Sequence, residues 1–188
     1  MRIISGSFKG KKIIEPKDKK TRPLKDLTKE SIFNIINHSH KFKVSMNNAL
    51  ILDVFSGTGS FGIECLSRGA QEVIFIENYG GVTSVLKKNL INLKTVHNYE
   101  IIEDDALNVN TFARLNKQFD IIFLDPPYKF ENLKSIFENI ENTRILKDEG
   151  IIISHRHKKT KDIFPTTMRV IEQKNYGISK IIFTTFLK

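Results

Sequence analysis

The central part of the chain alternates between short apolar runs and longer amphipathic segments. Five apolar runs of strand length occupy residues 49–55, 72–76, 99–103, 119–124 and 150–154. Four segments with helical spacing occupy residues 60–68, 81–92, 108–116 and 131–140. This alternation predicts an α/β fold, a mostly parallel sheet with helices on both faces. Two further strand-like runs flank Asn175 to Gly177 and predict an antiparallel C-terminal hairpin that closes the sheet.

The N-terminal segment has a different pattern. "RIISGSFKGKKII" places two short apolar and basic runs around Gly6 to Gly10, which predicts a hairpin. "PLKDLTKESIFNIINH" has apolar residues near helical spacing and predicts an amphipathic helix, whereas "KFKVSMNN" is typical of a linker. We therefore predict an extension, residues 1–45, made of a hairpin and a helix, followed by an α/β domain, residues 46–188.

Composition narrows the class of protein. The chain of 188 residues suits one domain with a short appendage, and it contains no run of eighteen apolar residues that would predict a membrane span. The start lacks the apolar region of a signal peptide. Cys65 is the single cysteine, so a disulfide within the chain or a cysteine-based zinc site is not expected. We expect a cytoplasmic, monomeric protein without a metal.

Basic residues are concentrated near the N-terminus. Residues 1–30 hold ten Lys and Arg against four Asp and Glu, so this segment carries +6 of the formal net charge of +9. A clustered basic arm is what phosphate-backbone binding uses, through the release of counterions. The alternative is a general bias of the chain towards lysine, which explains the residue type better than the clustering. The candidate RNA contacts are Lys9, Lys11, Lys12, Arg22 and Lys29.

A glycine-rich loop follows the first apolar run. "ILDVFSGTGSFGIE" contains the G-x-G-x-x-G spacing at Gly57, Gly59 and Gly62, where glycine lets the backbone turn tightly and approach a ligand. Glu77 ends the next strand, at the distance expected for an acid that accepts the hydroxyl hydrogens of a ribose. The pattern predicts a nucleoside cofactor, either NAD or S-adenosylmethionine. The alternative is a glycine turn that joins a strand to a helix and binds no ligand.

Two carboxylates favour S-adenosylmethionine. Asp53, at the end of the first strand, would face the positively charged methionine end of that cofactor, whereas it would repel a pyrophosphate. Asp105 follows the third strand, beside Ala106, where it could accept from an adenine amino group. The alternative for Asp104 or Asp105 is the N-cap of the helix that follows.

The stretch "DIIFLDPPYKF" ends an apolar run in an acid, two prolines and a tyrosine. Asp125 would emerge at the carboxyl edge of the sheet, where open α/β sheets bind ligands. Asp125 and the carbonyl of Pro126 could accept both hydrogens of an exocyclic amine, Pro127 would stiffen the turn, and Tyr128 would stack on the base. Asp125 could then act as a general base, although positioning should supply most of the rate. The alternative is a plain Pro-Pro turn before a helix.

The segments "DVFSGTGSFGIE", "LSRGA", "DPPY" and "TRPLKDLTKESIFN" together resemble the RsmD family, bacterial 16S rRNA guanine-N2 methyltransferases. The resemblance implies a Rossmann-like class I S-adenosylmethionine-dependent methyltransferase with a seven-stranded sheet and an N-terminal extension that engages RNA. It implies 16S rRNA, or the small ribosomal subunit, as the partner. It also implies that the cofactor lies against Asp53, Phe55, Ser56, Gly57, Thr58, Gly59, Glu77, Asp105 and Ala106.

This chain departs from the family pattern at two places. Leu27 and Lys29 stand where relatives usually have arginines. "SHRHKK" stands where relatives often have an acid, and His155 and His157, with their basic neighbours, could contact RNA phosphates. Three alternatives stay open: the same chemistry on a DNA adenine or a protein glutamine, an NAD-dependent oxidoreductase, and an RNA-binding module without catalysis.

Overall fold

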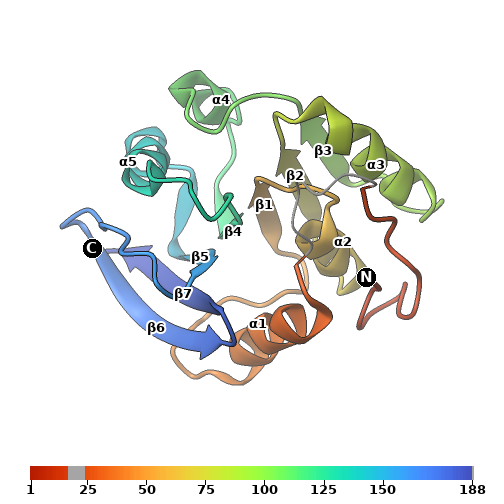
Figure 1. Ribbon diagram of the computed structural model, residues 1–188, viewed down its shortest axis with the longest axis horizontal. Coiled ribbons are helices and arrows are strands. Elements are labelled where there is room, and N and C mark those ends of the chain that lie inside the picture. The colour runs from red at the N-terminus through yellow and green to blue at the C-terminus, as the bar shows by residue number, and fades with distance from the viewer. Residues whose placement is uncertain (17–23, 188) are drawn as a thin grey trace.

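The computed structural model describes residues 1–16 and 24–187 of the chain (Figure 1). Its helices are α1 Asp26–His38, α2 Ser60–Ser67, α3 Gly80–Ile91, α4 Val109–Ala113 and α5 Leu133–Thr143. Its strands are β1 Leu50–Val54, β2 Glu72–Ile76, β3 Tyr99–Ile102, β4 Phe119–Leu124, β5 Leu146–His157, β6 Met168–Tyr176 and β7 Ser179–Phe186. The predicted order of elements is confirmed, although β5 is much longer than the predicted strand at 150–154.

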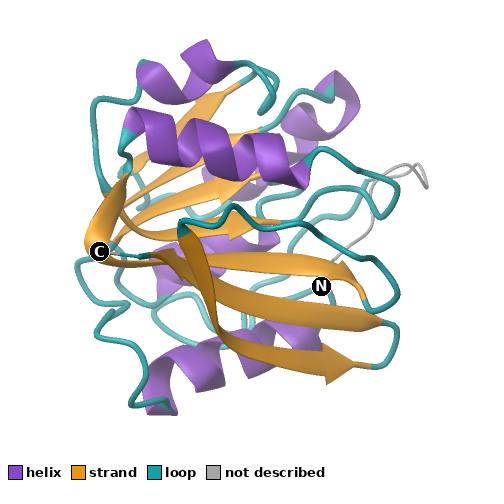
Figure 2. Ribbon diagram, turned by 90° about the vertical axis from the view of Figure 1, so that its left-hand side faces the viewer, coloured by secondary structure: helices purple, strands orange, loops and turns teal. Residues whose placement is uncertain are grey.

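The seven strands form one sheet in the order β3-β2-β1-β4-β5-β7-β6 (Figures 1 and 2). The first five pair in parallel, and β7 runs antiparallel to both β5 and β6. The chain moves outward from β1 to β3 and then returns to place β4 on the other side of β1. The ends of β1 and β4 therefore form the switch point of the sheet, where open α/β sheets bind ligands. The predicted fold class, including the C-terminal hairpin, is confirmed.

Helices cover both faces of the sheet and enclose two apolar cores. One core joins α1, α2 and α3 to one face of the sheet, with Phe33, Phe61 and Phe123 stacked in series. The other core joins α4 and α5 to the opposite face around Phe112 and Phe137. Figure 2 shows these helices on the two sides of the strands.

The N-terminal arm, residues 1–16, packs on the same core as α1. Its two halves run antiparallel and are joined by one bridge pair, Arg2 with Lys12, so the predicted hairpin is present in reduced form. Ile3 and Ile13 are buried in the core that contains the sheet residue Ile121. The arm is thus tied to the α/β domain by apolar packing as well as by the polar contacts that follow.

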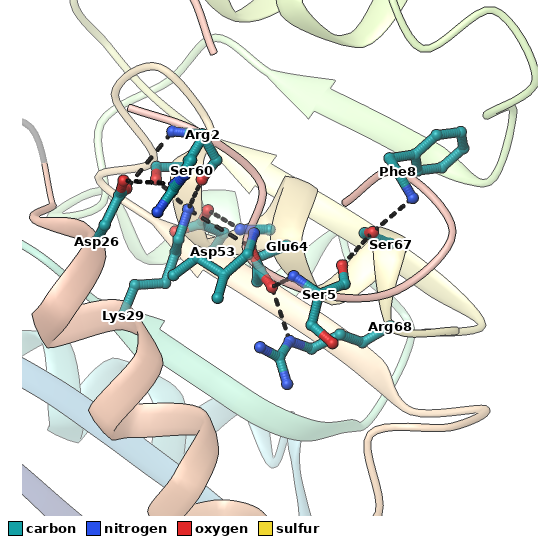
Figure 3. A network of polar contacts seen from close by, with 12 residues as sticks. Arg2, Ser5, Phe8, Asp26, Lys29, Asp53, Ser60, Glu64, Ser67 and Arg68 are labelled. Carbon is teal, nitrogen blue, oxygen red and sulfur yellow. Dashed lines mark hydrogen bonds and ion pairs between the residues drawn. The ribbon is translucent and has the colours of Figure 1, made fainter. Parts of the chain in front are cut away.

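Glu64 of α2 fixes the arm to the domain (Figure 3). Its buried carboxylate accepts the main-chain N–H groups of Ile4 and Ser5, at 2.8 and 2.9 Å. The same carboxylate lies 2.8 Å from Nε of Arg68 and 3.5 Å from Nζ of Lys29. Because a carboxylate this deep is costly unless it is paired, the two cations stabilise the charge of Glu64, and its two main-chain contacts hold the arm against α2.

Candidate active site

A cavity of about 480 Å³ opens at the carboxyl ends of β1 and β4. That volume lies within the range of roughly 300–1,000 Å³ typical of small-molecule and cofactor sites. Its wall is formed by the loops after β1, β2, β3 and β4, together with Pro16 and Leu24 from the N-terminal segment. Most of the predicted site residues line it: Asp53, Phe55, Ser56, Gly57, Thr58, Glu77, Asp105, Asp125, Pro126, Pro127 and Tyr128.

The glycine loop after β1 requires its glycines. Gly57 and Gly59 have φ angles of +55° and +79°, in the left-handed region that side chains rarely adopt. At Gly59 a Cβ atom would also lie 2.4 Å from Cδ1 of Leu86 on α3. Gly59 is not part of the cavity wall, so its role in this structure is to let the loop turn into α2.

Glu77 holds the loop from the end of β2. Its carboxylate accepts the N–H of Gly57 at 2.8 Å and the N–H of Tyr79 at 2.9 Å. Both bonds leave further lone pairs on the same two oxygens. Glu77 therefore supports the glycine loop while it still presents acceptor capacity to the cavity.

Asp53 is the most unusual group in the cavity. Its side chain is 1% exposed, and its carboxylate accepts one main-chain N–H, from Gly62 at 2.9 Å. Burial raises the pKa of Asp53 well above its ordinary value, and the nearby carboxylates of Asp125 and Glu77 raise it further. Within the described residues no lysine or arginine forms an ion pair with Asp53.

The loop after β3 contains two acids that the sequence left open as helix caps. The cap of α4 is instead Asn108, whose side chain accepts from the N–H of Asn110. Asp104 and Asp105 accept from the N–H groups of Asp105 and Leu107, which shapes the turn before the helix. Asp105 lines the cavity, whereas Ala106 lies in the apolar core and not in the cavity wall.

The loop after β4 lines the same cavity as the glycine loop. The N–H of Asp125 donates to the carbonyl of Val54 at 3.3 Å, which ties the end of β4 to the end of β1. Oδ1 of Asp125 lies 2.8 Å from Nδ1 of His155 on β5. The carbonyl of Pro127 accepts from the N–H of Phe130 at 2.9 Å, which closes the loop.

Tyr128 is held at the mouth of the cavity from two directions. Its hydroxyl oxygen lies 3.0 Å from Oγ of Ser179, at the start of β7. Its ring makes an edge contact with the ring of His157, with 5.0 Å between the centroids. These contacts fix the plane of an aromatic ring that also lines the cavity.

Sequence reasoning missed several residues of the wall. Tyr79 and Phe130 both line the cavity, and Phe130 makes an edge contact with Phe55 at 5.1 Å. The "NYGG" stretch after Glu77 carried a signal for Tyr79. A Cβ atom on Gly81 would lie 2.6 Å from the Tyr79 ring, so glycine leaves room for that ring at the start of α3.

The five predicted RNA contacts have different outcomes. Lys9, Lys11 and Lys12 are exposed on the arm. The prediction for Lys29 is wrong, because its side chain is fully buried and its Nζ donates to the carbonyl of Arg2 at 2.8 Å. Arg22 lies outside the described residues.

The expectation for "SHRHKK" also changes. His155 and Arg156 are buried and therefore do not face RNA phosphates. Nη2 of Arg156 donates to the carbonyl of Phe130 at 2.6 Å, and its Nε donates to Oδ1 of Asp162 at 2.8 Å. Both His155 and Arg156 act on the loop after β4 rather than on the surface.

Two other features bear on the class of protein. Among residues 1–16 and 24–187, no cluster of three or more His, Cys, Asp or Glu side chains is arranged to hold a metal ion. In the same residues, none of the helices is both long and apolar enough to cross a membrane.

The strand order, the glycine loop at the switch point and the acids at the ends of β1, β2 and β4 define a Rossmann-like class I methyltransferase fold. A family model described as "Conserved hypothetical protein 95" matches residues 1–185. The chain belongs to this family, the RsmD family, which includes proteins named ribosomal RNA small subunit methyltransferase D.

Individual relatives agree with this assignment. The chain is 32% identical to "Putative rRNA methyltransferase YlbH" of Bacillus subtilis, over 96% of each chain. It is also 32% identical to "Ribosomal RNA small subunit methyltransferase D" of Haemophilus influenzae, over 95% of this chain and 90% of that one. Among solved structures, "Putative methyltransferase yhhF" from Escherichia coli is 26% identical, with a TM-score of 0.82 over 98% of this chain and 96% of that one.

Proposed function

We propose that this protein transfers a methyl group from S-adenosylmethionine to the exocyclic N2 amine of a guanine in small-subunit ribosomal RNA. One observation carries the proposal: a single cavity brings the carboxylate of Asp53, which has no cationic partner among the described residues, next to the loop from Asp125 to Tyr128. The names of the relatives support ribosomal RNA as the substrate and methylation as the reaction.

The residues present fit S-adenosylmethionine. Oγ of Ser56, which is buried at the cavity wall, has no hydrogen-bond partner in the described part of the chain, so it is available to a ligand. Asp53 would hold the methionine end, because a positive ligand offsets the cost of its buried charge. Glu77 would bind the ribose hydroxyls, and Asp105 the adenine amine. When bound, this cofactor supplies an electrophilic methyl group on a sulfonium sulfur.

The loop after β4 would orient the amine that accepts the methyl group. Asp125 and the carbonyl of Pro126 would accept its two N–H bonds, whereas the carbonyl of Pro127 is already used by Phe130. These bonds direct the nitrogen lone pair away from the ring of the base and towards the methyl carbon. Tyr128 would stack on the base, and Asp125 would take the proton released once the new N–C bond has formed.

We assign RNA binding to the N-terminal extension, residues 1–45, through Lys9, Lys11 and Lys12. Their side chains are exposed on an arm that is itself fixed to α2, so they form a basic surface with a defined position. This assignment completes the division of the chain into an RNA-engaging extension and a methyltransferase domain, residues 46–188.

The product identifies the substrate amine. Small-subunit ribosomal RNA, naked or in under-methylated subunits, is incubated with the protein and labelled S-adenosylmethionine and then digested to nucleosides. Label in N2-methylguanosine is the expected result. Label in 6-methyladenosine, or label that stays in protein glutamine, would replace the proposed substrate by one of the alternatives.

The Asp125→Asn variant tests the role of the loop. We expect turnover to fall by about 10²–10⁴-fold, because the amide cannot take the proton. The affinity for S-adenosylhomocysteine, measured by titration calorimetry, should change little. Asp120→Asn on the same strand is the control, since Asp120 forms a surface ion pair with Lys147 at the other end of β4. Wild-type turnover by Asp125→Asn would reject this role.

A further inference from the structure

His155 of β5 lies beside Asp125, the first residue of the loop after β4. β5 pairs in parallel with β4, and Leu124 is in register with Ser154. The residues that follow these two, Asp125 and His155, therefore lie side by side. Nδ1 of His155 lies 2.8 Å from Oδ1 of Asp125. The imidazole is 3% exposed, whereas the carboxylate is 16% exposed towards the cavity. The histidine is therefore behind the carboxylate, on the side away from a ligand.

The chemistry of the pair sets the direction of the bond. An ionised carboxylate can only accept hydrogen bonds, so the proton between the two residues belongs to Nδ1 of the histidine. A donor fixed in a buried strand holds Oδ1 of Asp125 in one place. Fixing one oxygen also fixes the plane of the carboxylate, and hence the direction in which it meets an amine.

Arg156 holds the rest of the same loop. Its guanidinium is fully buried, and Nη2 and Nη1 donate to the carbonyls of Phe130 and Pro127, at 2.6 and 3.4 Å. His155 and Arg156, two successive residues of β5, therefore bind the loop after β4 at its first residue and near its last. Such a double attachment is expected where a reacting group must be held to a fraction of an ångström.

We propose that His155 is a positioning residue that orients the Asp125 carboxylate towards the amine to be methylated. The inference rests on the proposed function, since it concerns how the same loop meets its substrate. His155 would thus support the catalytic loop from a neighbouring strand. The sequence suggested a surface contact at this position.

Three substitutions of His155 distinguish a role of its hydrogen bond to Asp125 from a role of its side chain in packing. His155→Asn places an amide N–H at the position of Nδ1, His155→Gln places it nearer the position of Nε2, and His155→Leu removes the donor at similar bulk. We expect turnover at saturating substrates to fall by about 10–100-fold in the Leu and Gln variants, and the Asn variant to stay within about threefold of wild type. KM for S-adenosylmethionine should stay constant.

Equal losses in the Asn, Gln and Leu variants would overturn the proposal, as would wild-type turnover in all of them. If the Leu variant fails to fold, the contrast between Asn and Gln still decides. The effect of His155→Gln should also vanish in an Asp125→Asn background, because the bond then has no carboxylate to orient. These ratios can be read on whichever amine is methylated, so they are independent of the nucleoside analysis that tests the proposed function.

A different observation concerns the surface just beyond β5. The loop of residues 158–161 carries three lysines, Lys158, Lys159 and Lys161, all exposed and without ion pairs among the residues that the structure describes. The nearby acid, Asp162, has a side chain that is 2% exposed and is paired with Arg156 and Lys180, so it does not offset them.

This lysine loop is fixed and lies next to Tyr128. The N–H of Lys158 donates to the carbonyl of Ile178 at 2.9 Å, and Nζ of Lys180 donates to the carbonyl of Thr160 at 2.5 Å. His157, the last residue of β5 and the one just before this loop, makes an edge contact with the Tyr128 ring. The tip of the N-terminal arm is farther off, since the N–H of Phe8 donates to Oγ of Ser67, at the end of α2 that lies away from the cavity. α2 is eight residues long, or about 12 Å.

We infer that the lysine loop binds the phosphates next to the target base, on the assumption that RNA is the substrate. The tip of the N-terminal arm would then contact a more distant part of the same RNA. Three cations that form no ion pair among the described residues, on a loop that adjoins His157 and Tyr128, can bind the phosphates of an RNA strand whose base enters the cavity.

The test compares two triple variants with equal loss of charge. In one, Lys158, Lys159 and Lys161 become Gln; in the other, Lys94, Lys117 and Lys147 become Gln, near the amino ends of β3, β4 and β5. Binding of transcribed small-subunit ribosomal RNA is measured by fluorescence anisotropy over a range of salt. In the loop variant we expect the slope of log K against log salt to flatten by about 0.7–0.9 for each phosphate that is no longer bound, and KM for RNA to rise about tenfold or more.

The affinity for S-adenosylhomocysteine should be unchanged in both triple variants. An unchanged slope in the loop variant, or an equal change in the control, would overturn the inference. Because the slope reports phosphate binding and not the methylated atom, it stays informative even if the product is not N2-methylguanosine.

Discussion

Asp53, near the carboxyl end of β1, and Glu64, in the middle of α2, are two buried carboxylates whose surroundings differ in one respect. Glu64 is paired with Lys29 and Arg68 and accepts two main-chain N–H groups. Asp53 accepts a single N–H, and the charges nearest to it are other carboxylates. Figure 3 shows both acids in one view.

The difference separates a structural acid from a ligand-binding acid. A buried charge costs free energy unless it is paired, so Glu64, with its own cations, contributes to the fold. The charged form of Asp53 has no such partner among the described residues and is unfavourable, so a positive ligand would compensate it. Burial alone would have assigned both residues to the core, whereas the pattern of partners distinguishes them.

The largest effect should follow from removing the charge of Glu64. Glu64→Gln leaves Lys29 and Arg68 buried or half-buried without a counter-charge, so we expect the free energy of unfolding to fall by about 3–5 kcal/mol. Urea denaturation followed by circular dichroism measures this loss. Adding Lys29→Met should recover part of it. A loss below about 1 kcal/mol would show that the arm, and not this charge cluster, carries the stability.

Asp53→Asn should change the free energy of unfolding of the cofactor-free protein in the opposite direction. The amide still accepts from Gly62 but carries no buried charge, so we expect stability at neutral pH to rise by about 1 kcal/mol. The affinity for S-adenosylmethionine should fall by about tenfold or more, or about 1.4 kcal/mol. Calorimetric titration and thermal denaturation of the same samples check both parts. A more stable variant with unchanged affinity would remove Asp53 from the proposed cofactor site.

The raised pKa of Asp53 also predicts a pH dependence. In the unfolded chain this carboxyl titrates near 3.8, whereas in the folded chain it holds its proton to a higher pH. The folded state therefore binds more protons between the two pKa values, and stability should fall as the pH rises through that interval. The dependence should be weaker in Asp53→Asn. A positive ligand lowers this pKa, so wild-type protein should release protons on binding S-adenosylmethionine, as seen by calorimetry in two buffers.

The smallest effect should come from substitution of the exposed lysines of the N-terminal arm. Replacing Lys9, Lys11 and Lys12 by Gln should leave stability and turnover at saturating RNA nearly unchanged, because these side chains are exposed and lie outside the cavity wall. The slope of log K against log salt for RNA binding should flatten by about one unit for each phosphate that the variant fails to bind. An unchanged slope would show that the arm faces away from the RNA.

Lys29 illustrates what could be predicted from the sequence and what was misread. Lys29 lies three and four residues before Ile32 and Phe33, so it falls on the apolar stripe of α1, which signals burial. Its charge alone, by contrast, predicts a contact with RNA. Its partner Glu64 lies on α2, beyond β1, and no local pattern joins the two residues.

Local patterns determined the elements, the class of fold, and the glycine and Pro-Pro loops of the cavity. Helical and strand periodicity depend on neighbours within a few residues, and the glycine and Pro-Pro turns depend on backbone chemistry at single positions. The tertiary structure alone decided which charges meet. His155 reaches Asp125, and Lys29 reaches Glu64, because the strand order and the packing of α1 bring distant segments together. Charges are compensated in space and not along the chain, and for that reason the roles of the buried acids emerged only from the fold.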